Sequence, residues 1–274
     1  MMIPLQDIAL AALPGLALPQ ILDVFLQVFF VMLRIGAFAL SAPFFGSRLI
    51  ALPVRIVFTG LMAFFIYPRT TVPPVEVLQT LAAIGIIAHE LAIGLAAGLT
   101  LTILFASVSL AGEKIASTSG LSFAAQVDPN GGGQTPVVSQ AFNLLLIALF
   151  LSLNGHVAAI ALVVESYAYA PIGGALFMPS LVEGGMNAAS QMFRIAASIM
   201  FPVAGILLLV NFTIGIITRS APQLNLFSFG FPITLLTVFV VLFLFIGPLG
   251  AAFADLIQNT LQLLATTLRG ISNG

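Results

Sequence analysis

Six long apolar stretches make up most of this chain. They lie at about residues 20–45, 49–68, 75–111, 136–168, 188–218 and 231–268. A helix of about 20 apolar residues spans the hydrocarbon core of a bilayer and satisfies its own backbone hydrogen bonds. Outer-membrane strands are excluded, because the stretches are longer than about ten residues and lack an alternating pattern. The chain is therefore predicted to be an all-α integral membrane protein.

Three of the stretches are too long for one perpendicular crossing, which indicates kinked helices or helical hairpins. Proline and glycine separate the stretches and also occur inside them. Pro53, Pro202 and Pro248 lie within apolar stretches, where a missing N–H and a steric clash bend a helix. We therefore expect bent helices at these three positions.

Charged residues form only 6% of the chain, whereas soluble domains carry about 25%. The net charge of −1 gives no basic surface for nucleic acid, so no nucleic acid partner is expected. Cysteine is absent, which removes disulfides and thiolate metal sites. The membrane is the partner that this composition predicts.

Six ionisable side chains lie within or next to apolar stretches, where a charge at the bilayer centre costs about 2.5–3.5 kcal/mol. Each needs a partner or a position away from lipid. One interpretation is a proton or ion relay, and the other is a set of satisfied pairs between helices or subunits. We favour the pairs, because a relay needs several groups along one path. The six are Arg34, His89, Glu90, His156, Glu165 and Arg194.

No pattern in the chain indicates catalysis. His89 and Glu90 begin an HExxH zinc motif, but its second histidine is replaced by Ile93. The serine elbow GxSxG is absent, and no lysine follows the glycines at 131–133 as a phosphate-binding loop requires. We predict no catalytic residue, metal site or cofactor, and hence a protein that is not an enzyme.

A GxxxG pair, Gly94 and Gly98, lies in the small-residue run at 85–98. Such a pair lets a second helix approach closely. That helix could belong to another subunit, but packing within the chain is the simpler interpretation, since small residues are common in membrane helices.

A polar, glycine-rich segment at 112–135 interrupts the apolar pattern, and further motifs occur along the chain. They are RIGAFALSAPFFG at 34–46, LPVRI at 52–56, EKIASTSGLSFAAQVDP at 113–129, LNGH at 153–156, PIG at 171–173 and APQLNLFSFGFP at 221–232. Together, and in this order, they resemble the FliR family of the bacterial type III export gate over nearly the full length.

The resemblance implies a FliP-like part at about 1–185, followed by a FliQ-like helical hairpin at 186–274. It implies a subunit of the flagellar type III export gate, which forms a channel for flagellar axial proteins across the inner membrane, at the basal body. The implied partners are FliP-like, FliQ-like and FlhB-like subunits and unfolded exported proteins. Two alternatives remain open: the homologous subunit of a virulence injectisome, and a small-solute or ion transporter.

The resemblance also implies a plug that closes the pore. Glycine would supply conformational freedom, and a bulky side chain would block water in a narrow channel. The alternative is that 112–135 is only a long connection outside the membrane. The plug residues would be Gly120, Leu121, Ser122, Phe123, Ala124, Asp128 and Pro129.

Other polar residues are assigned to structure and interfaces. Glu113 with Lys114, and Arg219 near Gln223, would fix loops or neighbouring subunits through ion pairs and hydrogen bonds. Solvated helix ends are the alternative. The complete set is Arg34, Glu90, Glu113, Lys114, His156, Arg219 and Gln223.

Overall fold

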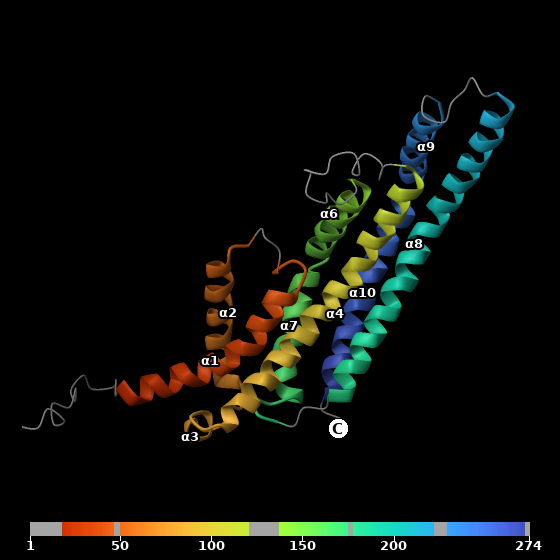
Figure 1. Cartoon of the computed structure of the whole chain (residues 1–274). Coiled ribbons are helices and arrows are strands. Elements are labelled where there is room, and N and C mark those ends of the chain that lie inside the picture. The colour runs from red at the N-terminus through yellow and green to blue at the C-terminus, as the bar shows by residue number, and fades with distance from the viewer. Residues whose placement is uncertain (1–17, 47–49, 121–136, 175–177, 222–228, 272–274) are drawn as a thin grey trace, which may run out of the picture. The chain divides into compact units, whose positions relative to one another are not determined.

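The computed structural model describes residues 18–46, 50–120, 137–174, 178–221 and 229–271 of the chain. Within these ranges every regular element is helical and no strand is formed, which confirms the predicted all-α class. The helices, labelled in Figure 1, are α1 Leu18–Ser41, α2 Leu52–Ile66, α3 Val75–Leu78, α4 Ala82–Thr118, α6 Val137–Ser152, α7 Gly155–Tyr169, α8 Met178–Ser220, α9 Phe231–Leu244 and α10 Ile246–Gly270.

Four helices in the described ranges are long and apolar enough to cross a membrane, and two bent pairs raise the number to as many as six. The bent pairs are α6 with α7, at 66°, and α9 with α10, at 62°. These pairs correspond to two of the long apolar stretches, so the expected kinks are present there. Helices α4 and α8 instead continue unbroken for 37 and 43 residues.

The three internal prolines have different effects. Pro53 lies in the first turn of α2, where its missing N–H leaves no helical hydrogen bond unmade, so the bend predicted there is wrong. Pro202 lies inside α8, which continues through it as one helix. Pro248 lies in the first turn of α10, directly after the break at Phe245 that separates α9 from α10.

The described residues form two compact units. One contains those of Met1–Leu99, Ile160–Leu181 and Thr266–Gly274, and the other contains those of Thr100–Ala159 and Val182–Ala265. We call them the first and the second unit. The boundary near 185 between a FliP-like and a FliQ-like part stays a prediction.

In the first unit, α1 packs against α2 and against the start of α4 (Figure 1). Gly94 and Gly98 of α4 face α1 so closely that an added Cβ at Gly94 would lie 2.7 Å from Cβ of Ala37. A Cβ at Gly98 would lie 2.8 Å from the backbone nitrogen of Ala42. This glycine pair therefore serves packing within the chain, which was the simpler of the two interpretations.

In the second unit, the end of α4 packs against α6 through small residues. A Cβ on Gly112 would lie 2.6 Å from Cα of Ser139, so only glycine fits there. Ser139 Oγ donates a hydrogen bond to the carbonyl of Ser109 at 3.1 Å, and Ser109 Oγ donates to Oδ1 of Asn143 at 2.9 Å. Neutral hydrogen bonds thus join α4 and α6.

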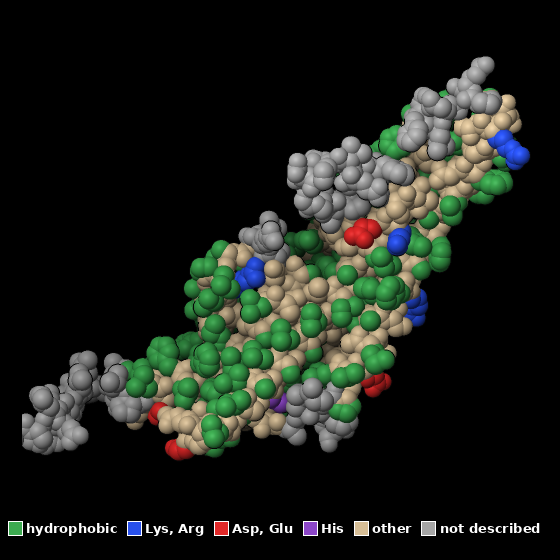
Figure 2. Space-filling model, viewed as in Figure 1, with side chains coloured by type: hydrophobic (Ala, Val, Ile, Leu, Met, Phe, Trp, Pro, Cys, Tyr) green, Lys and Arg blue, Asp and Glu red, His purple; other side chains and the backbone are tan. Residues whose placement is uncertain are grey.

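Apolar side chains cover much of the visible face of the molecule, and charged side chains are few and isolated (Figure 2). In the second unit, α9 exposes large apolar groups such as Phe239 and Phe243. The following part of α10 exposes polar side chains instead, including Asp255, Gln258 and Gln262. A protein with such an apolar surface is suited to lipid or to other subunits, not to water.

Candidate functional site: a buried arginine cluster

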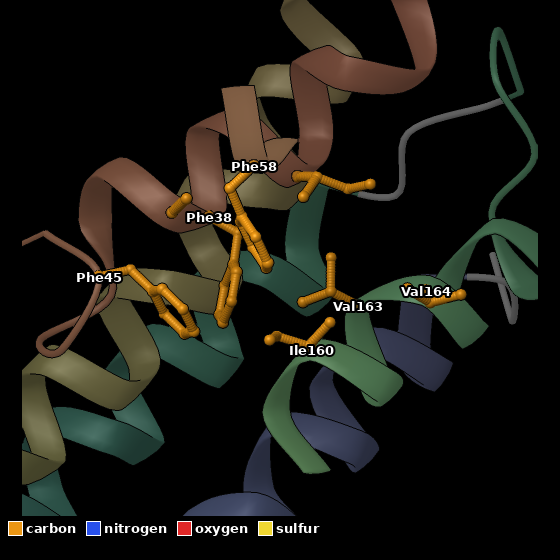
Figure 3. A pocket seen from close by; sticks show the side chains of 8 residues that line it. Phe38, Phe45, Phe58, Ile160, Val163 and Val164 are labelled. Carbon is orange, nitrogen blue, oxygen red and sulfur yellow. The ribbon is translucent and has the colours of Figure 1, made fainter. Parts of the chain in front are cut away.

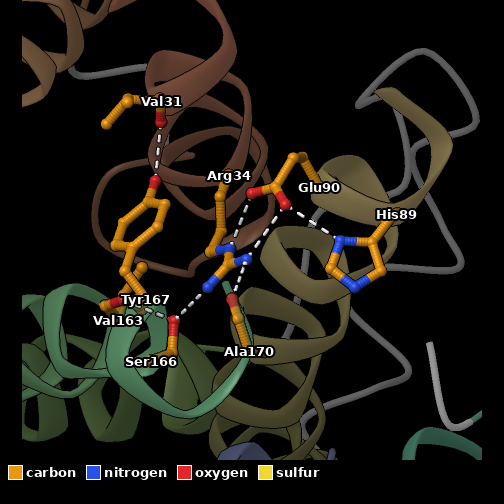
Figure 4. A network of polar contacts seen from close by, with 8 residues as sticks. All are labelled: Val31, Arg34, His89, Glu90, Val163, Ser166, Tyr167 and Ala170. Carbon is orange, nitrogen blue, oxygen red and sulfur yellow. Dashed lines mark hydrogen bonds and ion pairs between the residues drawn. The ribbon is translucent and has the colours of Figure 1, made fainter. Parts of the chain in front are cut away.

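The most strongly polar site of the first unit is centred on Arg34, in the C-terminal half of α1. Arg34 and Glu90 are both 0% exposed. Arg34 Nε donates to Glu90 Oε2 at 2.9 Å, and Nη2 donates to Oε1 at 3.0 Å. The guanidinium and the carboxylate therefore form a two-pronged ion pair, which is the strongest form of this contact. It joins α1 to α4 (Figure 4).

Helix α7 and the residue after it complete the coordination of the guanidinium. Arg34 Nη1 donates to Ser166 Oγ at 2.9 Å, and Nη2 also donates to the Ala170 carbonyl at 2.7 Å. The Tyr167 ring lies against the guanidinium, with its centroid 4.2 Å from Cζ. Tyr167 OH donates to the Val31 carbonyl on α1 at 2.6 Å. A charge buried in this way is fully compensated, which is the condition for retaining it.

His89 extends the cluster on the far side of Glu90 from Arg34 (Figure 4). Its Nδ1 lies 2.9 Å from Glu90 Oε1. An ionised carboxylate only accepts hydrogen bonds, and Glu90 is paired with Arg34, so Nδ1 is the donor. His89 Nε2 is buried and has no hydrogen-bond partner in the described structure.

Close packing of α1 and α4 brings the ion pair together. Gly94 follows Glu90 by one helical turn and therefore lies on the same face of α4. A Cβ at Gly94 would collide with the carbonyl oxygen of Arg34, so glycine allows the two backbones to approach. The short glutamate side chain then reaches the guanidinium. The sequence run from Glu90 to Gly94 thus determines the local geometry of the site.

An apolar cavity of about 10 Å³ lies near this cluster in the first unit. Phe38, Phe45 and Phe58 line one side of it, and Ile160 and Val163 line another (Figure 3). Its volume is about that of one water molecule, and a cavity lined only by apolar groups stays dry. We therefore assign it to packing and not to ligand binding.

The plug prediction falls mostly outside the described residues. Gly120 is described: it follows α4, and its φ of 80° lies in the left-handed region that favours glycine. Leu121, Ser122, Phe123, Ala124, Asp128 and Pro129 lie outside the described ranges, as does Gln223. The roles assigned to these residues stay predictions.

The remaining polar residues do not join the arginine cluster. Glu113 and Lys114 are exposed near the end of α4, and Arg219 is exposed at the end of α8. His156 is half-buried near the start of α7. Glu165 and Arg194, which the relay interpretation included, are both exposed. Of the six ionisable groups in apolar stretches, the structure brings together Arg34, His89 and Glu90.

The sequence did not reveal the partners on α7. Ser166 and Tyr167 lie in an apolar stretch in which Glu165 was the conspicuous residue. A serine in a membrane helix does not by itself indicate a buried polar site. Tyr167 is one of only three tyrosines in the chain, and that rarity was the one available signal. The carbonyl of Ala170 could not have been identified from side-chain chemistry.

Comparison with known proteins identifies the family. Residues 25–260 match the family described as Bacterial export proteins, family 1. The flagellar biosynthetic protein FliR of Escherichia coli (strain K12) is 34% identical over 238 residues, which cover 86% of this chain and 90% of that protein. The chain belongs to the FliR family of bacterial export proteins.

Further FliR family members agree over similar lengths. Flagellar biosynthetic protein FliR of Pectobacterium carotovorum subsp. carotovorum is 32% identical over 248 residues, covering 90% of this chain and 94% of that protein. The protein of the same name from Bacillus subtilis (strain 168) is 28% identical, covering 92% and 96%. With its long apolar helices, this FliR family member is a multi-pass protein of the bacterial inner membrane.

Proposed function

We propose that this chain, a subunit of the flagellar export apparatus, forms part of the channel that carries flagellar axial proteins across the inner membrane at the basal body. The observation that carries the proposal is the family match over residues 25–260. The relatives described above are flagellar proteins, which favours the flagellum over an injectisome. FliP-like, FliQ-like and FlhB-like subunits are the proposed partners, and unfolded proteins are the proposed substrates.

The arginine cluster supports a structural role for its charged groups. Arg34 directs hydrogen bonds to Glu90, Ser166 and the Ala170 carbonyl, so its guanidinium is occupied within the chain. A solute or ion transporter needs intramembrane polar groups that face its pathway. In the first unit the hydrogen bonds of Arg34 instead join three segments of one chain, which supports a structural role.

We further propose that residues 120–129 seal the closed channel. The test deletes 120–129 and measures ion leak across the inner membrane together with flagellin export in cells. We expect the deletion to raise the leak, because the bulky side chains of the segment no longer exclude water and ions. Removal of the three glycines at 131–133 is the matched control, and it should leave the leak unchanged.

Two results would contradict these proposals separately. Normal export with an unchanged leak after deletion of 120–129 removes the plug assignment and leaves the subunit assignment intact. Failure of the wild-type chain to co-purify with FliP-like and FliQ-like subunits, combined with solute transport by the purified chain alone in liposomes, overturns the subunit assignment itself.

A further inference from the structure

A cavity of about 350 Å³ lies in the first unit, between the segment that follows α2 and the end of α7. The ends of these two helices lie at the same end of that unit (Figure 1). Ile66 and Tyr167, which are both buried, contribute apolar surface to the cavity, as do Val164 and Ala168 of α7. Its volume is within the range of small-molecule sites. Two polar side chains that also line it are those of Arg69 and Thr71.

The charge of this cavity selects an anion. Arg69 is its one cationic group among the residues that the structure describes, and no acidic side chain lines it there. Tyr167 OH donates to the Val31 carbonyl, so it is already used. The guanidinium of Arg69 and the hydroxyl of Thr71 have no partner within the described ranges. A guanidinium binds two oxygen atoms of a phosphate at once, and a hydroxyl can donate to a third.

The length of α2 places this arginine at the level of lipid phosphates. The span Leu52–Arg69 has 18 residues and is apolar enough to cross a membrane. At about 1.5 Å per residue it is about 27 Å long, close to the thickness of a hydrocarbon core of about 30 Å. Near its other end, Arg55 Nε donates to the Ile50 carbonyl at 3.1 Å, so Arg69 is the arginine of this span that is available to a ligand. Large apolar side chains at four-residue spacing are exposed along α2: Val57, Leu61 and Phe65.

We propose that this cavity binds the headgroup of an anionic membrane phospholipid, with the phosphodiester on Arg69 and Thr71 and the acyl chains along the exposed side of α2. A soluble phosphate offers the same oxygen atoms, but it gains nothing from the apolar surface of α2. A zwitterionic lipid brings a cationic group to a cavity that already holds a cation. The inference goes beyond the proposed function, because it requires only that α2 lies in lipid.

Three variants separate the site from general attraction between the protein and a charged lipid. Arg69→Gln removes the cation and keeps a polar side chain. Arg219→Gln is the matched control, since Arg219 is also exposed at the end of a long apolar helix, α8, and does not line this cavity. Ala168→Leu keeps every charge and fills the cavity from α7. Ala168 is exposed, so the larger side chain should leave the fold intact.

The experiment titrates the full chain, in micelles of a non-ionic detergent, with phosphatidylglycerol and measures the rise in unfolding temperature. A ligand that binds the folded state raises this temperature in proportion to its occupancy and affinity. We expect phosphatidylglycerol to bind about tenfold more tightly than phosphatidylcholine. Arg69→Gln and Ala168→Leu should each weaken the binding of phosphatidylglycerol about tenfold, and Arg219→Gln should weaken it less than about twofold. Glycerol 3-phosphate, which lacks acyl chains, should give no rise at the same concentrations.

Three results would overturn the inference. Equal losses in Arg69→Gln and Arg219→Gln would mean that the lipid responds to surface charge and not to this cavity. An equal rise with glycerol 3-phosphate would make the ligand a soluble phosphate. Unchanged binding in Ala168→Leu would show that the cavity is not occupied, and that variant decides the question if Arg69→Gln does not fold. The export-apparatus assignment is tested separately, by co-purification of the wild-type chain with the other subunits.

Discussion

The two units bury polar groups in different ways. The first unit contains an ion pair with its complete set of partners, in which Arg34 and Glu90 are wholly buried. The second unit joins its helices through neutral contacts, such as Ser109 to Asn143, and Asn211 Nδ2 to the Thr118 carbonyl at 3.0 Å. Charged hydrogen bonds are about twice as strong as neutral ones, and their loss leaves an isolated charge.

This difference indicates how much stability each unit should lose when one of its buried polar residues is substituted. In the first unit, one residue links α1, α4 and the end of α7, so a change at Arg34 acts on three segments at once. In the second unit, each neutral contact links two helices, and close packing at Gly112 supports them. We expect polar substitutions to cost much more in the first unit than in the second, and three predictions test that order.

The largest effect is expected for Arg34→Met. It leaves the Glu90 carboxylate buried without a counter-charge, which should lower the free energy of unfolding by about 3–5 kcal/mol. The measurement is unfolding in detergent micelles, together with the amount of protein in the membrane. The double variant Arg34→Met with Glu90→Met removes both charges and should recover most of the loss. Additive losses in the double variant would show that the pair is not coupled.

An intermediate effect is expected for Tyr167→Phe. The ring still lies against the guanidinium, but the hydrogen bond to the Val31 carbonyl is lost. A lost neutral hydrogen bond costs about 1 kcal/mol. The same unfolding measurement should place this variant between Arg34→Met and any neutral contact of the second unit. A loss as large as that of Arg34→Met would mean that Tyr167, and not the ion pair, holds α7 in place.

The smallest effect is expected for Ser109→Ala in the second unit. It removes the hydrogen bond to Asn143 and keeps the backbone carbonyl that Ser139 uses. Hydrogen bonds between membrane helices contribute about 0.6 kcal/mol on average, so the loss of stability should be of that order. The check is a difference in unfolding free energy from the wild type. A loss above that of Tyr167→Phe would contradict the difference between the units.

The apolar pattern predicted the helical class and the location of the long helices, because length and hydropathy are properties of contiguous residues. The break at Phe245 also followed from local chemistry, since Gly247 and Pro248 lie beside it. Pro53 was misjudged, because proline at the start of a helix and proline inside one look alike until the first turn is located. Local sequence was therefore sufficient to predict the helical class, the long helices and the break at Phe245.

The site was less predictable, because its partners are distant in the chain. Arg34 and Glu90 stood out as charges within apolar stretches, and their burial cost required partners. Nothing in the sequence indicated that Ser166 and the Ala170 carbonyl would meet Arg34, since that contact depends on how α1 and α7 pack. Gly94 could have been linked to Glu90 by its spacing of one turn, but the motif alone did not say which helix it faced.

The arginine cluster also has a consequence for how the protein is made. Glu90 follows Arg34 by 56 residues, and Ser166 follows it by 132. At about 5–20 residues per second, synthesis from Arg34 to Glu90 takes roughly 3–11 s. Throughout that interval, α1 carries a guanidinium whose carboxylate does not yet exist. Until α4 is made, the Arg34 guanidinium therefore has to stay hydrated or meet an insertion cost of about 2.5–3.5 kcal/mol.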